Sequence, residues 1–232
     1  MQHDKADWRD ILMGTLDSIK TTQPKTAACR ISPWYAPVKR LMDIAIAATI
    51  LTVALPVLLP IALIVMLDSP GPIFYRRHVV GRHGKPFYAF KLRTMVEESD
   101  LSYITDGGRR EEFKSRYKLR KDPRVTRVGR YLRKASIDEL PQLINVLKGE
   151  MSLVGPRMIS FPELEKFGPW QDKILEVKPG ITGLWQVSGR SNLEYDDRVR
   201  LNVYYVDNRS VMLDVIILAK TIPAVISAKG AY

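Results

Sequence analysis

Residues 44–67 read IAIAATILTVALPVLLPIALIVML, a run of 24 residues without a charged side chain. As a straight α-helix this run would be about 36 Å long, enough to cross the hydrocarbon core of a bilayer. It starts beyond residue 40 and no small-residue cleavage site follows, so a cleaved signal peptide does not explain it. A buried core helix is the alternative interpretation. Because the run is long and holds no charge, we expect a membrane-embedded helix.

Two features of this run argue against a simple spanning helix. Pro56 and Pro60 lie in its middle, where proline breaks or bends a helix. Both flanks are basic, with Lys39 on one side and Arg76 on the other. Because Lys and Arg favour the cytoplasmic side of a membrane, both ends are expected there. The sequence thus predicts a re-entrant helix hairpin over residues 38–68, broken at the prolines, with a spanning helix as the alternative.

The positive charge of the chain is concentrated in one block. The net charge is +11, and the stretch from Arg76 to Lys134 alone holds 18 Lys or Arg against 7 Asp or Glu, a difference of 11. Such a block indicates an anionic partner, which can be nucleic acid, anionic lipid or a phosphorylated substrate, although part of it can be a solvated surface. No recognisable nucleic-acid-binding motif accompanies it, which disfavours nucleic acid.

Cysteine and histidine usage excludes several kinds of site. Cys29 is the single cysteine, so the chain has no internal disulfide and no cysteine-based zinc cluster. The three histidines are scattered along the chain and do not form a metal-binding pattern. The sequence also contains neither a Walker A loop nor a G-x-G-x-x-G motif. If the protein binds a nucleotide, residues outside these two common motifs must therefore hold it.

An adjacent acid pair, Asp138 and Glu139, follows the basic stretch RVTRVGRYLRK of residues 124–134. Ser136 and Glu139 have the spacing of a capping box, which predicts Ser136 as the N-cap of a helix. A carboxylate in the first turn tends to stay ionised, and a phosphate can share its site if cations or a metal offset the repulsion. From spacing alone, simple helix capping is the commoner explanation. Pro141 fits poorly inside such a helix, which indicates a later start or a kink.

The remaining patterns complete an α+β fold that is mainly helical, with interfacial amphipathic helices and a small cytoplasmic domain. The expected division is an N-terminal amphipathic and linker segment over 1–37, the membrane helix over 38–68 and a membrane-associated cytoplasmic domain over 69–232. The expected elements are an amphipathic segment over 1–20, strands at 73–75 and 87–90 around a turn at 81–84, a helix over 162–177 and an interfacial or core helix over 211–228.

Several long motifs, in this order, resemble the bacterial sugar transferases, which are monotopic polyprenyl-phosphate phosphoglycosyl transferases. The similarity runs over about residues 38–226. Two departures from the family pattern are Leu55 before Pro56, where the family has Ser, and Met158 after the Gly-Pro-Arg turn, where the family has Pro. The motifs are KRLMD at 39–43, FKLRTM at 90–95, DPRVTRVGRYLRKASIDELPQLINVLKGEMSLVGPR at 122–157, KPGITGLWQVSGR at 178–190 and YYVDN at 204–208.

The resemblance implies a specific reaction and assigns roles to residues. Such enzymes transfer a sugar-1-phosphate from a nucleoside diphosphate sugar, expected here to be a UDP-sugar, to polyprenyl phosphate, and release the nucleoside monophosphate. Asp138 looks like the nucleophile, Glu139 its assistant, and Mg²⁺ the cofactor, with Asp138 as a metal contact. The expected phosphate-binding residues are Arg133 and Arg157, with Lys91 and Arg93 as further candidates for which structural ion pairing is the alternative.

The resemblance also implies a setting for the protein. The expected partners are UDP-sugar, polyprenyl phosphate and the lipid bilayer, with a homodimer as an open option and no nucleic acid. The expected location is the bacterial inner membrane, with the catalytic domain on its cytoplasmic face. The transferred sugar is expected to be glucose or galactose. The alternatives are a membrane-tethered nucleic-acid-binding protein and a catalytically inactive scaffold.

Overall fold

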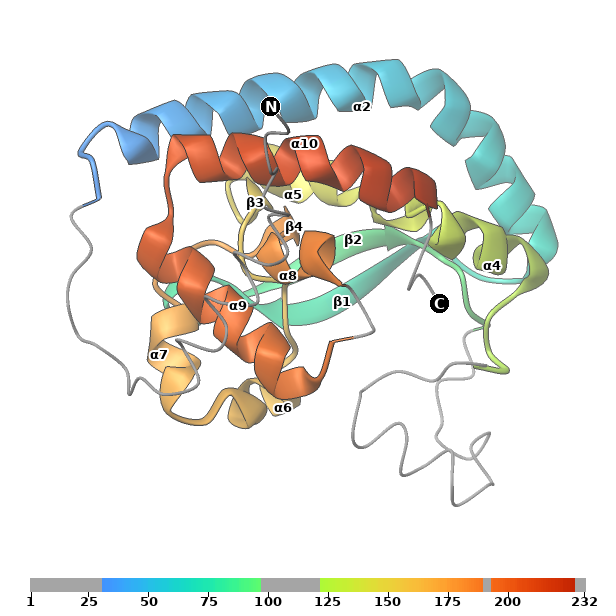
Figure 1. The fold of residues 1–232 in the computed structure, drawn as a ribbon. Coiled ribbons are helices and arrows are strands. Elements are labelled where there is room, and N and C mark those ends of the chain that lie inside the picture. Colours follow the sequence, from blue (N-terminus) through green and yellow to red (C-terminus); the bar gives the residue numbers. More distant parts are fainter. Residues whose placement is uncertain (1–30, 97–121, 190–192, 228–232) are drawn as a thin grey trace, which may run out of the picture.

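The computed structural model describes residues 31–96, 122–189 and 193–227. The described part is mainly helical, with two small two-stranded sheets, which confirms the predicted mainly helical character (Figure 1). The amphipathic segment predicted over 1–20 lies outside the described residues, as do most of the 1–37 segment and Cys29.

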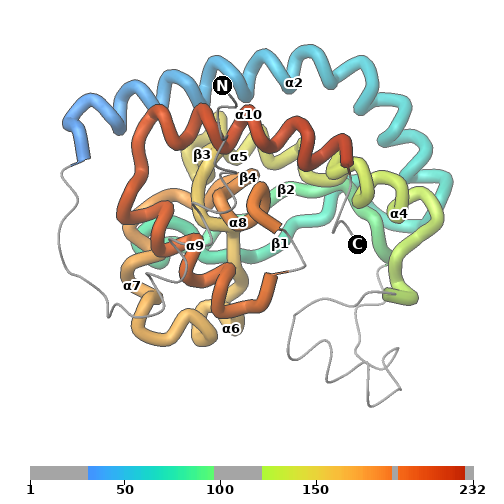
Figure 2. The backbone as a smooth tube through the Cα atoms, in the orientation of Figure 1, coloured from blue at the N-terminus to red at the C-terminus, as the bar shows by residue number. Residues whose placement is uncertain are grey.

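The apolar run forms one long helix, α2 (Tyr35–Asp68), of 34 residues. The helix continues through Pro56 and Pro60 and curves over the domain in its second half (Figures 1 and 2). The expected break at the prolines is therefore absent, and the re-entrant path of this helix through a membrane stays a prediction. Packing accounts for the continuity, because Val65 of the second half is buried against Leu132 in a small apolar cluster that holds the helix down beyond the prolines.

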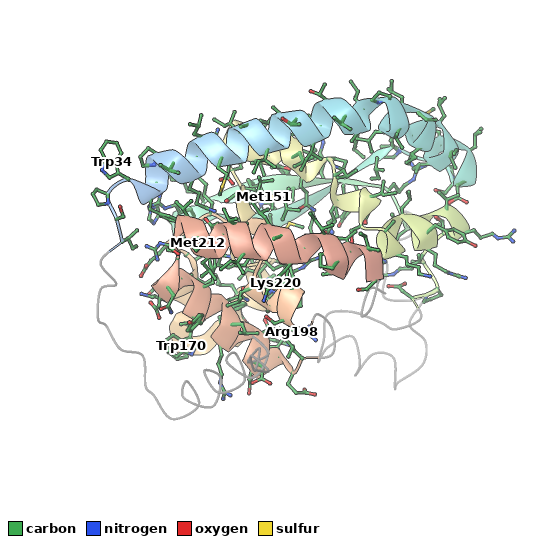
Figure 3. All side chains as sticks on the ribbon, turned by 45° about the horizontal axis from the view of Figure 1, so that its top comes forward. Trp34, Met151, Trp170, Arg198, Met212 and Lys220 are labelled. Carbon is green, nitrogen blue, oxygen red and sulfur yellow. The ribbon has the colours of Figure 1, made fainter. Side chains whose placement is uncertain are left out.

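The outer side of α2 suits a lipid environment. By length and composition α2 can cross a membrane, and only 6% of its most apolar stretch is buried inside the protein. A second apolar helix, α10 (Val211–Ser227), runs beside it and exposes Met212, Ile222 and Ile226 (Figures 1 and 2). Figure 3 shows side chains standing out along α2, away from the domain. The two helices together form an apolar surface of the kind that inserts into a bilayer interface.

The KRLMD motif at the start of α2 anchors this helix to the rest of the protein. Lys39, Arg40 and Asp43 each reach a different element. The contacts are Lys39 Nζ to Asp214 at 2.8 Å, Arg40 to the carbonyl oxygens of Val146 at 2.6 Å and Leu147 at 2.8 Å, and Asp43 Oδ1 to Ser152 Oγ at 3.1 Å and Leu153 N at 3.0 Å.

The two expected strands are confirmed as a hairpin of β1 (Phe74–Val80) and β2 (Pro86–Leu92), closed by a 3₁₀ turn, η1 (Arg82–Gly84). The strands are antiparallel, with Phe74 opposite Leu92 and Val80 opposite Pro86. The second sheet pairs β3 (Ser152–Val154) with β4 (Gly180–Thr182) in parallel. The helix α5 (Gln142–Lys148) packs against both α2 and β2.

The single helix predicted over 162–177 is wrong. The structure has three short pieces there: α6 (Phe161–Leu164), η4 (Glu165–Trp170) and α7 (Gln171–Ile174). Gly168 has a φ of 51° and Pro169 follows it, so the helical hydrogen-bond ladder cannot continue. Two further helices, α8 (Leu184–Ser188) and α9 (Tyr195–Asn208), lead to α10, which confirms the helix expected over 211–228.

A buried cluster around Asp214 joins the two apolar helices. Asp214 is fully buried; besides Lys39, its carboxylate accepts hydrogen bonds from Tyr35 Oη at 3.1 Å and Tyr205 Oη at 2.7 Å. Because three donors converge on one carboxylate, its removal leaves the largely buried Lys39 cation and the Tyr35 hydroxyl without this acceptor, whereas Tyr205 Oη keeps the carbonyl oxygen of Val154 at 3.1 Å.

We therefore predict that Asp214→Ala lowers the free energy of unfolding by about 3–5 kcal/mol, the usual effect of removing one partner of a buried ion pair. Thermal unfolding in detergent measures this. Asp172→Ala, at an exposed position of α7, is the matched control. It should shift the unfolding midpoint of the wild type by about one or two degrees at most, which corresponds to about 0.5 kcal/mol. Equal midpoints for the two variants would contradict the structural role of Asp214.

Candidate active site

The acid pair lies in a tight turn between two helices. The first helix, α4 (Arg127–Lys134), is capped by Thr126, whose Oγ1 accepts a hydrogen bond from Gly129 N at 2.9 Å. The pair follows in a 3₁₀ turn, η3 (Ile137–Glu139). The predicted capping box is wrong, because Ser136 has a left-handed backbone (φ 57°) and its side chain caps nothing. The later helix start indicated by Pro141 is confirmed, since α5 begins at Gln142.

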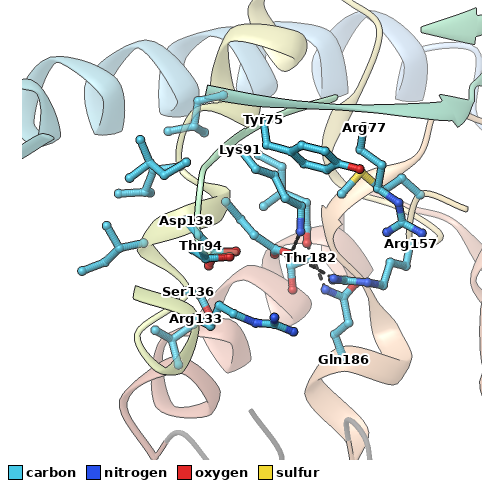
Figure 4. Close-up of a pocket in the computed structure, with 18 of the residues that line it drawn as sticks. Tyr75, Arg77, Lys91, Thr94, Arg133, Ser136, Asp138, Arg157, Thr182 and Gln186 are labelled. Carbon is cyan, nitrogen blue, oxygen red and sulfur yellow. Dashed lines mark hydrogen bonds and ion pairs between the residues drawn. The ribbon is translucent and has the colours of Figure 1, made fainter. Parts of the chain in front are cut away.

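The acid pair opens into a large pocket of about 1420 Å³. The hairpin, α4, η3, β4, α8, α9 and α10 contribute to its walls. All six residues expected in the site line this pocket: Lys91, Arg93, Arg133, Asp138, Glu139 and Arg157. Figure 4 labels four of them, Lys91, Arg133, Asp138 and Arg157. The structure thus gathers residues that are up to 66 positions apart in the sequence.

Glu139 is held by two cations on the same oxygen. Lys91 Nζ lies 2.7 Å and Arg157 Nη2 lies 2.9 Å from Glu139 Oε1. Burial by itself would raise the pKa of the Glu139 carboxyl, but the charges and hydrogen bonds of Arg157 and Lys91 outweigh it and hold this pKa far below its ordinary value. Glu139 is therefore a permanently ionised carboxylate that fixes the positions of two cations.

Asp138 has a different environment from its neighbour. It is 7% exposed, and no described residue donates a hydrogen bond to its carboxylate. Burial raises the pKa of the Asp138 carboxyl; Lys91 opposes this rise and the negative charge of Glu139 adds to it. Because its oxygens are not engaged by a partner while cations stand close by, Asp138 is the carboxylate that can react with or ligate a substrate.

Asn145 positions the strand that carries Lys91, and the sequence analysis missed it. Asn145 is fully buried in α5; its Oδ1 accepts from Phe90 N at 3.0 Å and its Nδ2 donates to Tyr88 O at 2.8 Å. These bonds fix β2 against α5, one residue before Lys91. An asparagine within the apolar run QLINVL was the available signal, because a buried amide needs partners.

Arg157 is positioned by close contact of two glycine-containing segments. A Cβ atom on Gly180 would lie 2.2 Å from Gly155 N, so only glycine permits this approach. Gly180 N donates to Pro156 O at 2.8 Å, and Arg157 pairs with Gly180 as an isolated bridge. Met158, the departure from the family pattern, is 2% exposed and packs into the core, so the segment stays anchored without the proline.

The other predicted cations differ in their roles. Arg133 lines the pocket and its guanidinium group points into it (Figure 4). Arg93 is buried and donates hydrogen bonds to the carbonyl oxygens of Val65, Ser69 and Pro72, so it caps the C-terminus of α2. The prediction of Arg93 as a phosphate-binding residue is therefore corrected to the structural alternative.

Two further observations concern the basic block. Arg77, which the sequence analysis did not assign to the site, lines the pocket and forms an ion pair with Glu163 at 3.5 Å. The cations of α4 also differ from one another in exposure. Arg127, Arg130 and Lys134 are exposed, whereas Arg133 faces the pocket.

The residues present fit a Mg²⁺ ion that is shared with a substrate. No group of three or more His, Cys, Asp or Glu side chains with metal-binding geometry occurs among the residues that the structure describes. Mg²⁺, however, is commonly bound by one or two carboxylates together with phosphate oxygens and water. The carboxylate of Asp138, which accepts no hydrogen bond from the described part of the chain, can supply such a ligand.

A long apolar helix beside a pocket with paired acids and converging cations is the arrangement of a membrane-associated protein that handles anionic substrates. The sequence profile of the bacterial sugar transferase family matches residues 34–228. The chain belongs to this family.

Individual relatives agree with this family. The chain is 47% identical over 198 residues to the undecaprenyl-phosphate galactose phosphotransferase of Salmonella typhimurium. The aligned region covers 84% of this chain and 41% of that protein. It is 46% identical to the UDP-galactose-lipid carrier transferase of Erwinia amylovora, with the same coverage of both chains. It is 42% identical to the exopolysaccharide production protein ExoY of Sinorhizobium fredii, covering 84% of this chain and 88% of that protein. The chain thus spans about two fifths of the first two relatives and most of the third.

The opposite environments of the two acids lead to a prediction about stability. A depressed pKa means that Glu139 stabilises the fold at pH values above its unfolded pKa of about 4.3 and loses this effect as the pH falls toward its folded pKa. A raised pKa means that ionised Asp138 destabilises the fold above its unfolded pKa of about 3.9.

At pH 7.5 we expect Glu139→Gln to lower the free energy of unfolding by about 2 kcal/mol, because two charge-assisted hydrogen bonds weaken. Asp138→Asn should raise the unfolding midpoint. Thermal unfolding of the two variants, beside the exposed control Glu165→Gln, measures this difference. A midpoint that falls for Asp138→Asn and stays unchanged for Glu139→Gln would show that the assigned environments are reversed.

Proposed function

We propose that this protein transfers a hexose-1-phosphate from a UDP-sugar to a polyprenyl phosphate, undecaprenyl phosphate in bacteria, and releases UMP. The observation that carries this proposal is the unequal acid pair: Glu139 is neutralised by Lys91 and Arg157, whereas Asp138 has no such partner in the pocket. Galactose and glucose are the proposed sugars, and the names of two relatives refer to galactose. The product would begin the assembly of an exopolysaccharide or glycoconjugate.

In the first step, an Asp138 carboxylate oxygen attacks the β-phosphorus of the UDP-sugar. A bond forms between this oxygen and phosphorus, and the bond from phosphorus to the bridging oxygen breaks, so that UMP leaves with the electron pair. Arg133 and Arg157 line the pocket and can bind the phosphate oxygens. Asp138 and the diphosphate would hold Mg²⁺, which would neutralise negative charge when bound.

In the second step, a phosphate oxygen of the lipid attacks the same phosphorus. The bond to Asp138 breaks, the carboxylate is regenerated, and the lipid carries a sugar diphosphate. Glu139, next in the chain and ionised, keeps Lys91 and Arg157 in place through both steps. Two half-reactions at one carboxylate suit substrates that arrive from different phases.

The apolar helices account for access by the lipid substrate. The pocket is lined on one side by Ile50 of α2 and by Leu218 and Val225 of α10, the same helices that present apolar surface to the outside. The hydrocarbon chain of a polyprenyl phosphate can therefore stay against apolar side chains while its phosphate reaches the acid pair.

We expect Asp138→Asn to reduce UMP release by at least about a thousandfold, because the nucleophile is lost. Protein in nanodiscs is incubated with undecaprenyl phosphate, Mg²⁺ and a panel of UDP-sugars, and UMP is quantified. Chelation of Mg²⁺ should also stop release. Asp172→Asn, at an exposed site, is the control and should retain activity.

A fully active Asp138→Asn variant would contradict the proposed mechanism. Absence of UMP release by well-folded wild-type protein across the panel would support the inactive scaffold. Salt-sensitive binding of DNA or RNA by that protein would support the nucleic-acid-binding alternative, which the basic block alone favours.

The proposed substrates imply a location at the inner membrane, with the catalytic domain on the cytoplasmic face. Both ends of α2 should then lie on that face.

Cysteine labelling tests the position of the two ends of α2. Single cysteines are introduced at Trp34, before α2, and at Arg76, after it, both exposed, in a Cys29→Ser background. A membrane-impermeant maleimide should label both in inside-out vesicles and neither in intact spheroplasts, as expected for a helix that enters and leaves on one face. A cysteine at exposed Glu165 marks the side of the catalytic domain. Labelling of Trp34→Cys and Arg76→Cys from opposite faces would show a spanning helix.

A further inference from the structure

One wall of the pocket consists of α8 and the strand before it, and the mechanism above makes no use of it. Trp185 and Gln186 of α8 line the pocket together with Thr182 of β4 and Asn202 of α9. These residues are uncharged and can donate or accept hydrogen bonds. They differ in this respect from the cations around Glu139, so this wall suits an uncharged polar part of a substrate.

Two polar atoms of this wall have no partner within the described residues. They are Trp185 Nε1, which is a donor, and Gln186 Oε1, which is an acceptor, and both are buried. Buried polar groups are nearly always paired in native proteins, and a group left unpaired needs an explanation. A donor and an acceptor on consecutive residues of a pocket wall indicate a ligand that offers the complementary pair.

The orientation of both side chains is fixed by their other contacts. Gln186 Nε2 donates to Ile181 O at 3.0 Å, and since a carbonyl oxygen can only accept, the amide oxygen is the group left over. The guanidinium carbon of Arg198 lies 5.3 Å from the centre of the Trp185 ring, so the face of the indole is occupied. Trp185 therefore offers the N–H at its edge rather than a stacking surface on that face.

The wall lies beside the catalytic residues. Figure 4 shows Gln186 and Thr182 next to Arg157, which holds Glu139. In a UDP-sugar the hexose is attached directly to the β-phosphorus, whereas the uracil is separated from it by the α-phosphate and the ribose. A polar wall next to the acid pair is therefore closer to the hexose of a bound UDP-sugar than to its base.

We propose that Trp185 and Gln186 bind hydroxyl groups of the hexose and determine which sugar the protein accepts. This inference rests on the proposed function and extends it to the choice of substrate. A sugar hydroxyl accepts from the indole N–H and donates to the amide oxygen, which satisfies both groups. A site built to bond a hydroxyl discriminates against a sugar whose hydroxyl is inverted, because its own buried polar groups then stay unpaired.

The test uses Trp185→Phe, which removes the N–H and keeps an aromatic ring under Arg198. The kcat/KM for UMP release is measured for UDP-galactose and UDP-glucose, with the inhibition constant of UMP, which contains the base but no hexose. For the preferred sugar we expect roughly a three- to tenfold fall, with a smaller fall for the other sugar and unchanged inhibition by UMP. Trp170→Phe, in η4 and outside the pocket lining, is the matched control.

Gln186→Met provides a second variant of similar shape, and circular dichroism and thermal unfolding confirm that each variant folds. An equal loss of kcat/KM for both sugars, together with weaker inhibition by UMP, would assign the wall to the nucleobase and overturn the proposal. Unchanged kinetics of both variants would overturn it as well. Calorimetric binding of the two UDP-sugars to wild type and Trp185→Phe requires no turnover. Loss of discrimination there supports the proposal independently, whereas equal discrimination by both proteins overturns it. Absence of UMP release by the wild type contradicts the proposed function instead.

Discussion

The shared contact of Lys91 and Arg157 with one oxygen of Glu139 is the interaction on which the site depends. It joins three segments that are distant in sequence: the hairpin, the η3 turn and the segment after β3. Each ion by itself would be costly to bury, and together the two cations and one carboxylate form a group with one net positive charge. That charge partly offsets the burial of Asp138, which carries the reactive oxygens. The positions of the remaining pocket residues follow from how each segment is tied to this contact.

Much of the architecture could be predicted because it follows from local pattern. The apolar run predicted a long helix, two short aromatic-rich stretches around a glycine turn predicted the hairpin, and Pro141 indicated the late start of α5. The site required more than pattern. Spacing alone favoured simple capping for Asp138 and Glu139, and only the resemblance to a family brought Lys91 and Arg157 to them.

Two of the differences from expectation originate in tertiary contacts. Arg93 lies in a motif with Lys91, yet the free carbonyl groups at the end of α2 take its donors. The helix continues past Pro60 because its second half is packed on α4. In both cases the deciding partner lies far away in the sequence, where no local pattern can show it. Ser136 differs, because it has the right spacing for a cap but the tight passage from α4 into η3 gives it a left-handed conformation.

The end of the strand β2 links the long apolar helix α2 to the acid pair. Lys91 holds the acid pair, and Arg93, two residues later, holds the last carbonyl groups of α2. Alternate residues of an extended chain lie on the same side, so both side chains are mounted on one short, stiff segment. The end of the apolar helix and the acid pair are thereby held by neighbouring residues of one segment. The carbonyl groups that end α2 and the carboxylate of Glu139 thus share a mechanical support, although they belong to different parts of the fold.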